Sequence, residues 1–159
     1  MELYLLRHGI PVDSASWDGP DATRPLTDAG EAQVLRVLGR LHERNELVAR
    51  RVLTSPFVRA AQTATLAARV LGVALEQFEP LASGSSPDRI LRGLARRGGD
   101  EGALLLVGHS PDLSMLTAAL AGGSSLEHPF DRCGIARLSG SLEPGGMRRL
   151  WLLSPQEVT

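Results

Sequence analysis

The sequence begins with a short, continuous apolar run that leads directly into charged and polar residues. Residues 3–6 read Leu-Tyr-Leu-Leu, and Arg7, His8 and Gly9 follow. A continuous apolar run, rather than an alternating one, is typical of a parallel strand that is buried on both faces. Ligands of open α/β sheets bind just beyond the carboxyl ends of such strands, so Arg7 and His8 are predicted at the floor of a crevice. Gly9 is expected to let a ligand approach the backbone closely.

A second run repeats this arrangement. Residues 103–107 read Ala-Leu-Leu-Leu-Val and are expected to form a central strand. They lead into Gly108, His109, Ser110 and Pro111, and a serine followed by a proline predicts the start of a helix. The free amides of a helix N-terminus and the helix dipole together favour an anion. His109 and Ser110 are therefore expected beside an anion site.

Helical and extended patterns alternate through the rest of the chain, which is typical of an α/β fold with a parallel sheet. Further strands are predicted at residues 52–54, 73–78, 135–138 and 147–153, with 73–78 at an edge and the last two joined as a hairpin. Helices are predicted at residues 28–44, at 56–71, from 86 to the glycines at 98 and 99, and from 110 to the residue before Gly122.

Composition and length limit the classes of protein that fit. The 159 residues, 43% of them hydrophobic, suit one compact domain spanning residues 1–159. A formal net charge of −1 gives no overall attraction to nucleic acid or to a membrane, so any anion site must be local. Cys133 is the only cysteine, which excludes an intramolecular disulfide and a cysteine-rich metal site. With no apolar run of about 18 residues and no leader pattern, we expect a soluble, cytoplasmic protein.

Two further features are consistent with a local anion site. Residues 10–26 contain three prolines and three aspartates and are predicted to form a long loop over the mouth of the crevice, the alternative being a plain surface connection. Arg59 falls in the first turn of a predicted helix, where the dipole disfavours a cation by roughly 0.3–1 kcal/mol. A bound anion would offset this cost, although a surface arginine that reaches solvent is the simpler alternative.

Arg7, His8, Arg59 and His109 are thus all predicted at the carboxyl ends of strands or in the first turn of a following helix. Two arginines, two imidazoles and a helix N-terminus suit a compact dianion such as a phosphoryl group. A metal site is the competing interpretation, and it is disfavoured because no paired carboxylate is present and the arginines would repel a cation. His42 is interpreted as a surface residue, and His128 as one that at most lines the rim of the pocket.

These motifs resemble those of the histidine phosphatase superfamily, in its phosphoglycerate-mutase-like branch. The residues that carry the resemblance are Leu5-Leu6-Arg7-His8-Gly9, Arg24-Pro25-Leu26-Thr27 with Gly30, Thr54-Ser55-Pro56 with Arg59, Gln62 and Thr63, and Val107-Gly108-His109-Ser110-Pro111. The short chain and the segment 21–30 are most similar to small bacterial phosphohistidine phosphatases of the SixA type. The resemblance implies a three-layer α/β/α sandwich around a central, mostly parallel sheet, with no metal or cofactor.

The resemblance also implies a role for each of the four residues. His8 would attack phosphorus in line and become transiently phosphorylated, after which water releases inorganic phosphate. Arg7, Arg59 and His109 would hold the equatorial oxygens of the phosphoryl group, with Gly9 and Ser110 also in the phosphate site. Positioning and electrostatics supply most of the acceleration in such a reaction.

The sequence departs from the mutase and sugar-phosphatase pattern at Ser83. Those relatives carry an acidic proton donor two residues after the leucine that corresponds to Leu81, and a serine is a poor general acid near neutral pH. An imidazole leaves from phosphorus without such help more readily than an alkoxide, since its pKa is about 6.5. The hypothesis is therefore a phosphohistidine-bearing protein as substrate. Glu79 and the aspartates at 13, 18 and 21 remain alternative proton donors.

Two other functions stay open at this stage: a broad phosphomonoesterase that acts on small phosphorylated substrates, and a non-catalytic module that binds phosphoproteins. The basic face formed by Arg89, Arg92 and Arg96 is interpreted as a solvated helix face, or, if the substrate is a protein, as a surface that steers an acidic partner.

Overall fold

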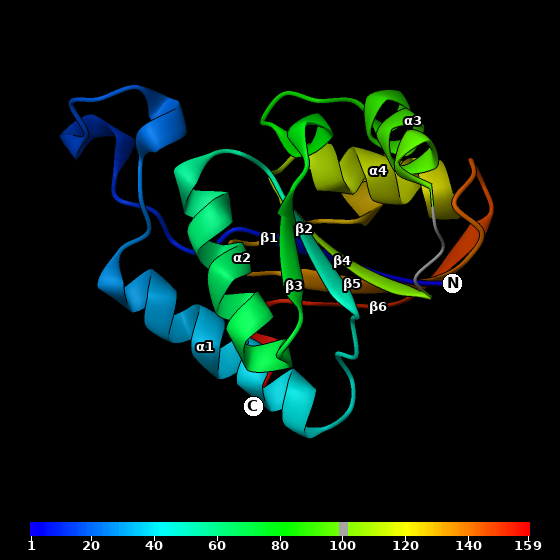
Figure 1. Ribbon diagram of the computed structural model, residues 1–159, viewed down its shortest axis with the longest axis horizontal. Helices are drawn as coiled ribbons and strands as arrows, with labels where there is room; N and C mark the ends of the chain where they lie inside the picture. The colour runs from blue at the N-terminus through cyan, green and yellow to red at the C-terminus, as the bar shows by residue number, and fades with distance from the viewer. Residues whose placement is uncertain (99–101) are drawn as a thin grey trace.

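The computed structural model describes residues 1–98 and 102–159, and its described part forms a six-stranded sheet between two layers of helices (Figure 1). The strands are β1 (Glu2–Arg7), β2 (Arg51–Thr54), β3 (Ala74–Gln77), β4 (Ala103–Gly108), β5 (Ile135–Gly140) and β6 (Met147–Leu153), in the order β3-β2-β4-β1-β5-β6. Strands β3, β2, β4 and β1 are parallel to one another, and β5 is antiparallel to β1 and β6. This architecture confirms the predicted three-layer α/β/α sandwich.

Two helices cover each face of the sheet (Figure 1). Helices α1 (Asp28–Glu43) and α2 (Val58–Leu71) lie on one face, and α3 (Pro87–Arg97) and α4 (Asp112–Ala121) lie on the other. None of the helices in the described ranges has the length and apolar character needed to span a bilayer.

The apolar run of β1 is continuous because its side chains supply two separate cores. Tyr4 and Leu6 pack with α1 and α2, whereas Leu3 and Leu5 pack with α3 and α4. Since successive side chains of a strand point to opposite faces, a strand between two helical layers must be apolar at every position. Strand β4 divides its side chains in the same way, which confirms its predicted central place, and β3 lies at the predicted edge.

Two predicted helix starts are wrong by two residues. Helix α2 begins at Val58 rather than Pro56, because Phe57 has an extended backbone with ψ of 137°. Helix α4 begins at Asp112 rather than Ser110, with Pro111 as its N-cap. In each case a short turn separates the strand from its helix. Helix α3 ends at the predicted Gly98, whereas the predicted Gly99 lies outside the described residues.

The loop at residues 10–26 lies beyond the carboxyl end of β1 (Figure 1), where Arg59 of α2 binds its residue Asp21. A bridge between Pro11 and Leu26 closes its base, and it contains two short 3-10 helices, Ser14–Ser16 and Asp21–Thr23. The indole of Trp17 donates to Thr23 across the loop at 3.2 Å. The segment is therefore a folded loop with internal hydrogen bonds, placed where the sequence predicts a cover for the crevice.

Candidate active site

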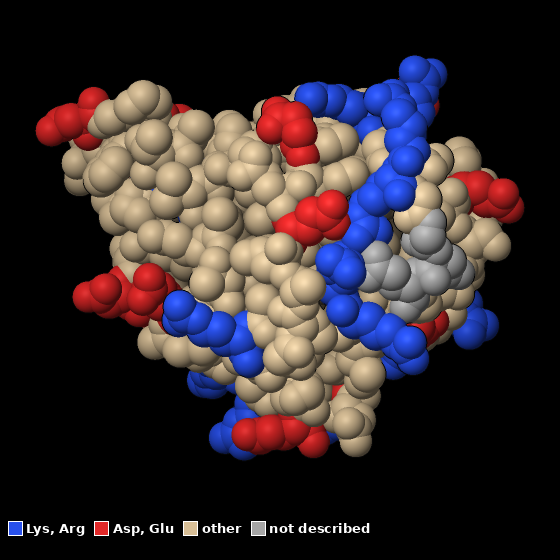
Figure 2. Space-filling model, in the orientation of Figure 1, with Lys and Arg blue, Asp and Glu red and all other residues tan. Residues whose placement is uncertain are grey.

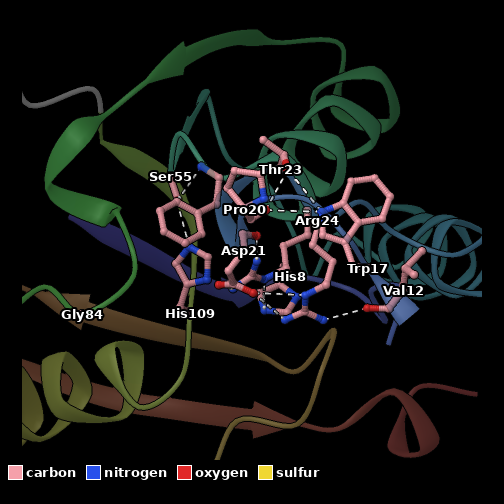
Figure 3. A network of polar contacts seen from close by, with 12 residues as sticks. His8, Val12, Trp17, Pro20, Asp21, Thr23, Arg24, Ser55, Gly84 and His109 are labelled. Atoms are coloured by element: carbon pink, nitrogen blue, oxygen red, sulfur yellow. Dashed lines mark hydrogen bonds and ion pairs between the residues drawn. The ribbon is translucent and has the colours of Figure 1, made fainter. Parts of the chain in front are cut away.

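The two predicted histidines lie side by side because they follow neighbouring parallel strands. Arg7 at the end of β1 pairs in register with Gly108 at the end of β4, so His8 and His109 are the next residues on adjacent strands. Their ring centroids are 5.3 Å apart and both side chains are buried. Figure 3 shows the two rings with Ser55 on the His109 side and Arg24 on the His8 side.

His8 has one ring nitrogen fixed by its own backbone. Its Nδ1 lies 2.8 Å from the carbonyl oxygen of Gly9, and because a carbonyl can only accept, Nδ1 carries the proton. The lone pair is therefore on Nε2, which accepts a 3.4 Å hydrogen bond from Nε of Arg59. Burial lowers the pKa of His8 to about 4, and the positive charges of Arg59 and Arg7 add to this while the bond to Gly9 opposes it. The ring is neutral at pH 7, with its lone pair on Nε2.

His109 is fixed at the other nitrogen. Its Nε2 lies 2.8 Å from the hydroxyl of Ser55, which also accepts a hydrogen bond from the backbone N–H of Phe57. Nδ1 of His109 is buried and has no hydrogen-bond partner among the described residues. Since the Ser55 oxygen already accepts one bond, its own proton is best directed at Nε2, which leaves the His109 proton on Nδ1. Burial, with the charges of His8 and Arg59 adding to it, lowers the pKa of His109 to about 3.

Arg59 fills the space between His8 and the loop at 10–26. It is the second residue of α2 and is only 5% exposed. Besides the bond from Nε to His8, Nη1 donates to the carbonyl of Asp21 at 2.9 Å and Nη2 to its carboxylate at 3.1 Å. Every nitrogen of this guanidinium is thus engaged, and two of the three bind the loop. An anion at this arginine must take over contacts that Asp21 now makes.

Asp21 is itself shared between two arginines. Its carboxylate receives Nε and Nη2 of Arg24, both at 3.1 Å, as well as Nη2 of Arg59. Burial acts to raise the pKa of Asp21, but the hydrogen bonds from Arg24 and Arg59 outweigh it and lower the pKa below its ordinary value. The aspartate is ionised near neutral pH, so the loop places a negative charge at the mouth of the site rather than a ready proton donor.

Arg7 lies partly buried at the end of β1. Its Nη1 donates to the carbonyl of Phe130 at 2.8 Å, whereas its buried Nε has no partner among the described residues. The free donors of Arg7 and His109, the lone pair of His8 and the guanidinium of Arg59 thus belong to one cluster. Such a cluster can accept a tetrahedral anion between its donors and present a nucleophile to the central atom.

Gly9 and Ser110 lie beside this cluster in a way that the sequence interpretation only partly anticipates. The Gly9 N–H donates to the hydroxyl of Thr63 at 3.1 Å. A Cβ at Gly9 would stand 2.8 Å from a methyl of Val34, so helix α1 approaches this glycine closely, and the predicted approach of a ligand stays a prediction. Ser110 lies in the turn between His109 and α4 and is partly exposed.

Glu79, one of the alternative proton donors, lies near an arginine of α3. Glu79 is exposed, and its carboxylate lies 3.9 Å from the guanidinium of Arg89. Ser83 is also exposed, and the loop that carries it is held by the buried carboxylate of Asp112, which accepts the N–H groups of Gly84 and Ser85 at 2.9 and 3.2 Å.

The other histidines do not join the cluster. His128, predicted at most to line the pocket rim, has both ring nitrogens engaged, one by the carbonyl of Gly122 and the other by Arg149. His42 is exposed on α1. Within residues 1–98 and 102–159, no group of three or more histidine, cysteine, aspartate or glutamate side chains is arranged to hold a metal ion.

The predicted basic face lies on α3, where Figure 2 shows arginine side chains gathered on the surface. Arg92 pairs with Asp88 at 3.2 Å, and Arg89 lies near Glu79. Carboxylates thus already offset part of this positive charge, and a role in steering an acidic partner stays a prediction.

Sequence reasoning missed three contributors to the site. Ser55 and Arg24 were predicted only as parts of the family motifs, although they contact His109 and Asp21 respectively. Arg132 was not noticed, yet its charge acts on both Arg7 and His8. It precedes β5, which is antiparallel to β1, so the amino end of β5 meets the carboxyl end of β1. No local pattern around Arg132 indicates this neighbour, because it depends on strand order.

The sequence is similar to known proteins over most of its length. The sequence matches the histidine phosphatase superfamily (branch 1) over residues 3–83. An uncharacterised protein from Picosynechococcus sp. is 42% identical over 130 residues, 80% of this chain and 78% of that protein. The phosphohistidine phosphatase SixA of Escherichia coli is 28% identical over 161 residues, 98% of this chain and 94% of that protein.

The fold agrees with these sequence matches. A solved structure of the protein histidine phosphatase SixA complexed with tungstate has a TM-score of 0.84 and 25% identity to this chain, with 100% of each chain covered. The matched residues 3–83 include Arg7, His8 and Arg59, and the structural match extends to the strand that carries His109. This chain therefore belongs to branch 1 of the histidine phosphatase superfamily.

Proposed function

We propose that this protein is a metal-independent phosphatase that hydrolyses phosphohistidine on proteins through a phosphorylated His8. The observation that carries the proposal is the pair of fixed imidazoles: His8 has its lone pair on Nε2, where it accepts from Nε of Arg59, and His109 has a buried Nδ1 without a partner among the described residues. A nucleophile beside a fixed donor, with two arginines, fits phosphoryl transfer better than simple anion binding.

In the first step Nε2 of His8 attacks phosphorus while the bond from phosphorus to the substrate's imidazole nitrogen breaks. The electron pair of that bond goes to the leaving imidazole, which takes a proton from water. Arg7, Arg59 and His109 hold the phosphoryl oxygens and neutralise their charge. For Arg59 to do so, the two donors now bound to Asp21 must turn to the phosphoryl group.

In the second step a water molecule attacks the phosphorus of phosphorylated His8. The bond between phosphorus and Nε2 breaks, its electron pair returns to the ring, and inorganic phosphate leaves. The low pKa of His8, caused by burial and the nearby arginines, keeps the released ring neutral for another turn.

The leaving group favours phosphohistidine over phosphate esters. An alkoxide needs a proton from a general acid, and two of the candidate acids are poor donors: Glu79 lies 3.9 Å from Arg89, and Asp21 is held ionised by Arg24 and Arg59. An imidazole, with a pKa of about 6.5, leaves without such help. The SixA proteins that this chain resembles bear the name of phosphohistidine phosphatases, which also supports the proposal.

A substrate panel tests the proposal. The full chain is given a histidine-phosphorylated protein, p-nitrophenyl phosphate, which has a good leaving group, and glycerol phosphate, which has a poor one. We expect kcat/KM for the phosphoprotein to exceed that for glycerol phosphate by at least about 100-fold, the usual worth of a general acid. Comparable rates for the two would instead indicate a broad phosphomonoesterase, and no turnover of any substrate would indicate a binding module.

A further inference from the structure

Arg132 is an arginine without a counter-ion beside the nucleophile. Its side chain is exposed, and among residues 1–98 and 102–159 no carboxylate lies within salt-bridge distance of it. Its charge lowers the pKa of Arg7 and, with Arg59 and Arg7, that of His8, in addition to the effect of burial. By contrast, Arg89 and Arg92 of α3 lie near Glu79 and Asp88.

The position of Arg132 is fixed by its neighbours on both sides. Before it, the carbonyl of Phe130 accepts Nη1 of Arg7 at 2.8 Å. After it, the N–H of Cys133 lies 3.1 Å from the carbonyl of Arg7 and 3.0 Å from that of His8, with Cys133 at a φ of 60°. A non-glycine residue rarely adopts this left-handed backbone, and here it directs one N–H at both carbonyls. The loop therefore places Arg132 at a set position relative to His8.

Arg132 lines a polar cavity at the surface. It has a volume of 380 Å³ and is lined by Pro11, Asp13, Ser14, Arg24 and Arg132. Its only acidic wall residue is Asp13, whose carboxylate accepts the N–H of Ala15. Arg24, on the other wall, already binds Asp21 and the carbonyl of Val12. Figure 3 shows Arg24 and Val12 on the side of His8 away from His109.

We propose that this cavity is a second anion subsite, in which Arg132 binds the carboxylate of an aspartate or glutamate that lies close in sequence to the phosphohistidine of the substrate protein. Arg132 supplies the unpaired charge, whereas Asp21 offsets the charge of Arg24 on the opposite wall. The cavity is too small for a folded element and suits one acidic side chain. This inference rests on the proposed function, since it assumes a polypeptide substrate.

The test uses two phosphohistidine peptides that differ only in glutamate or glutamine beside the phosphohistidine. We expect the wild type to prefer the acidic peptide, and Arg132→Gln to lower kcat/KM for it about tenfold, as for loss of a hydrogen bond to a charged group. The readout is the ratio of kcat/KM for the acidic peptide to that for the neutral peptide, because the charge of Arg132 also acts on Arg7 and His8 and a change common to both peptides cancels in this ratio. Arg148→Gln is the matched control, because Arg148 is exposed at the opposite end of the sheet, in register with Ser139 and through it with Glu2.

Equal effects of Arg132→Gln on both peptides, or none on either, would overturn the subsite. If the wild type hydrolyses neither peptide but does hydrolyse p-nitrophenyl phosphate, the proposed function fails and the subsite is judged separately. In that case phosphonopropionate and ethylphosphonate are compared as inhibitors of p-nitrophenyl phosphate hydrolysis. Tighter inhibition by phosphonopropionate, lost in Arg132→Gln, supports a carboxylate subsite, whereas an unchanged ratio of inhibition constants contradicts it.

Discussion

His8 and His109 follow neighbouring parallel strands, yet their rings are held at opposite nitrogens. His8 is held at Nδ1 by the carbonyl of the next residue, Gly9, whereas His109 is held at Nε2 by Ser55, which is 54 residues away in sequence. The first arrangement leaves a lone pair in the site and the second leaves an N–H. Two similar strand ends therefore present a lone pair and an N–H, because a different ring nitrogen is engaged in each histidine.

The largest effect should come from His8→Ala, which removes the lone pair. We expect turnover of a phosphohistidine substrate to fall by roughly 10⁴-fold or more, because no other side chain in the cluster can replace the nucleophile. Steady-state kinetics measures the loss, and an unchanged melting temperature shows that the fold is intact. Residual activity near the wild-type value would mean that His8 is not the nucleophile.

His109 should have a smaller effect and one that a different side chain can restore. We expect His109→Ala to lower kcat by about 10²–10³-fold, as for loss of one donor to a developing charge. His109→Asn should regain part of this loss, because its amide N–H lies near the place of Nδ1–H. Equal kcat values for the two variants would contradict a donor role.

Ser55→Ala should loosen the His109 ring without removing either imidazole. It takes away the hydroxyl that engages Nε2 of His109, so the ring is free to move its proton to Nε2. We expect kcat to fall about tenfold and the free energy of unfolding to fall by about 1–3 kcal/mol for a buried unpaired group. Nitrogen NMR of the imidazoles reports the tautomer directly, and an unchanged His109 spectrum would rule out control by Ser55.

Asp21→Asn should act through Arg59, which both rings share as a neighbour. Removing a carboxylate that holds Arg59 frees donors for the phosphoryl group, so phosphate should bind about threefold more tightly. The gain is small because the Asp21 side chain is 58% exposed. Asp18→Asn on the same loop is the control. Weaker phosphate binding in Asp21→Asn would show that Asp21 positions Arg59 rather than competing for it.

The smallest change is expected on mild acidification. The folded pKa values of about 4 for His8 and about 3 for His109 mean that both rings stay mostly neutral down to pH 5. Their proton NMR shifts should hardly move between pH 7 and 5, and a midpoint near 6.5 would contradict this.

The same shifts lower stability in acid. In the unfolded chain these histidines take up protons below a pH of about 6.5, before the folded rings do. The free energy of unfolding should therefore fall as the pH drops from about 6.5 toward 4. Urea denaturation at several pH values measures the slope, which should be shallower in His8→Ala.

The fold and the convergence of four residues could be predicted because both follow from strand ends. Parallel strands bring their carboxyl ends to one edge, so His8 and His109 meet whichever helices intervene. The contacts of Ser55, Asp21 and Arg132 could not be predicted, since each depends on a turn, a folded loop or the antiparallel placement of β5 beside β1. The starts of α2 and α4 were missed for a similar reason, because a proline next to a serine marks a turn as readily as a helix.

The most direct test of the account is the position of the phosphoryl group in the trapped intermediate. The full chain is mixed with a labelled phosphohistidine protein, quenched in alkali and digested, and the phosphorylated residue and ring nitrogen are identified by mass spectrometry and phosphorus NMR. We expect an acid-labile phosphoryl group on Nε2 of His8 in the wild type. It should be absent from His8→Ala and should form more slowly in His109→Ala than in the wild type. A phosphoryl group on His109, or on Nδ1 of His8, would contradict the division of roles between the two strand ends.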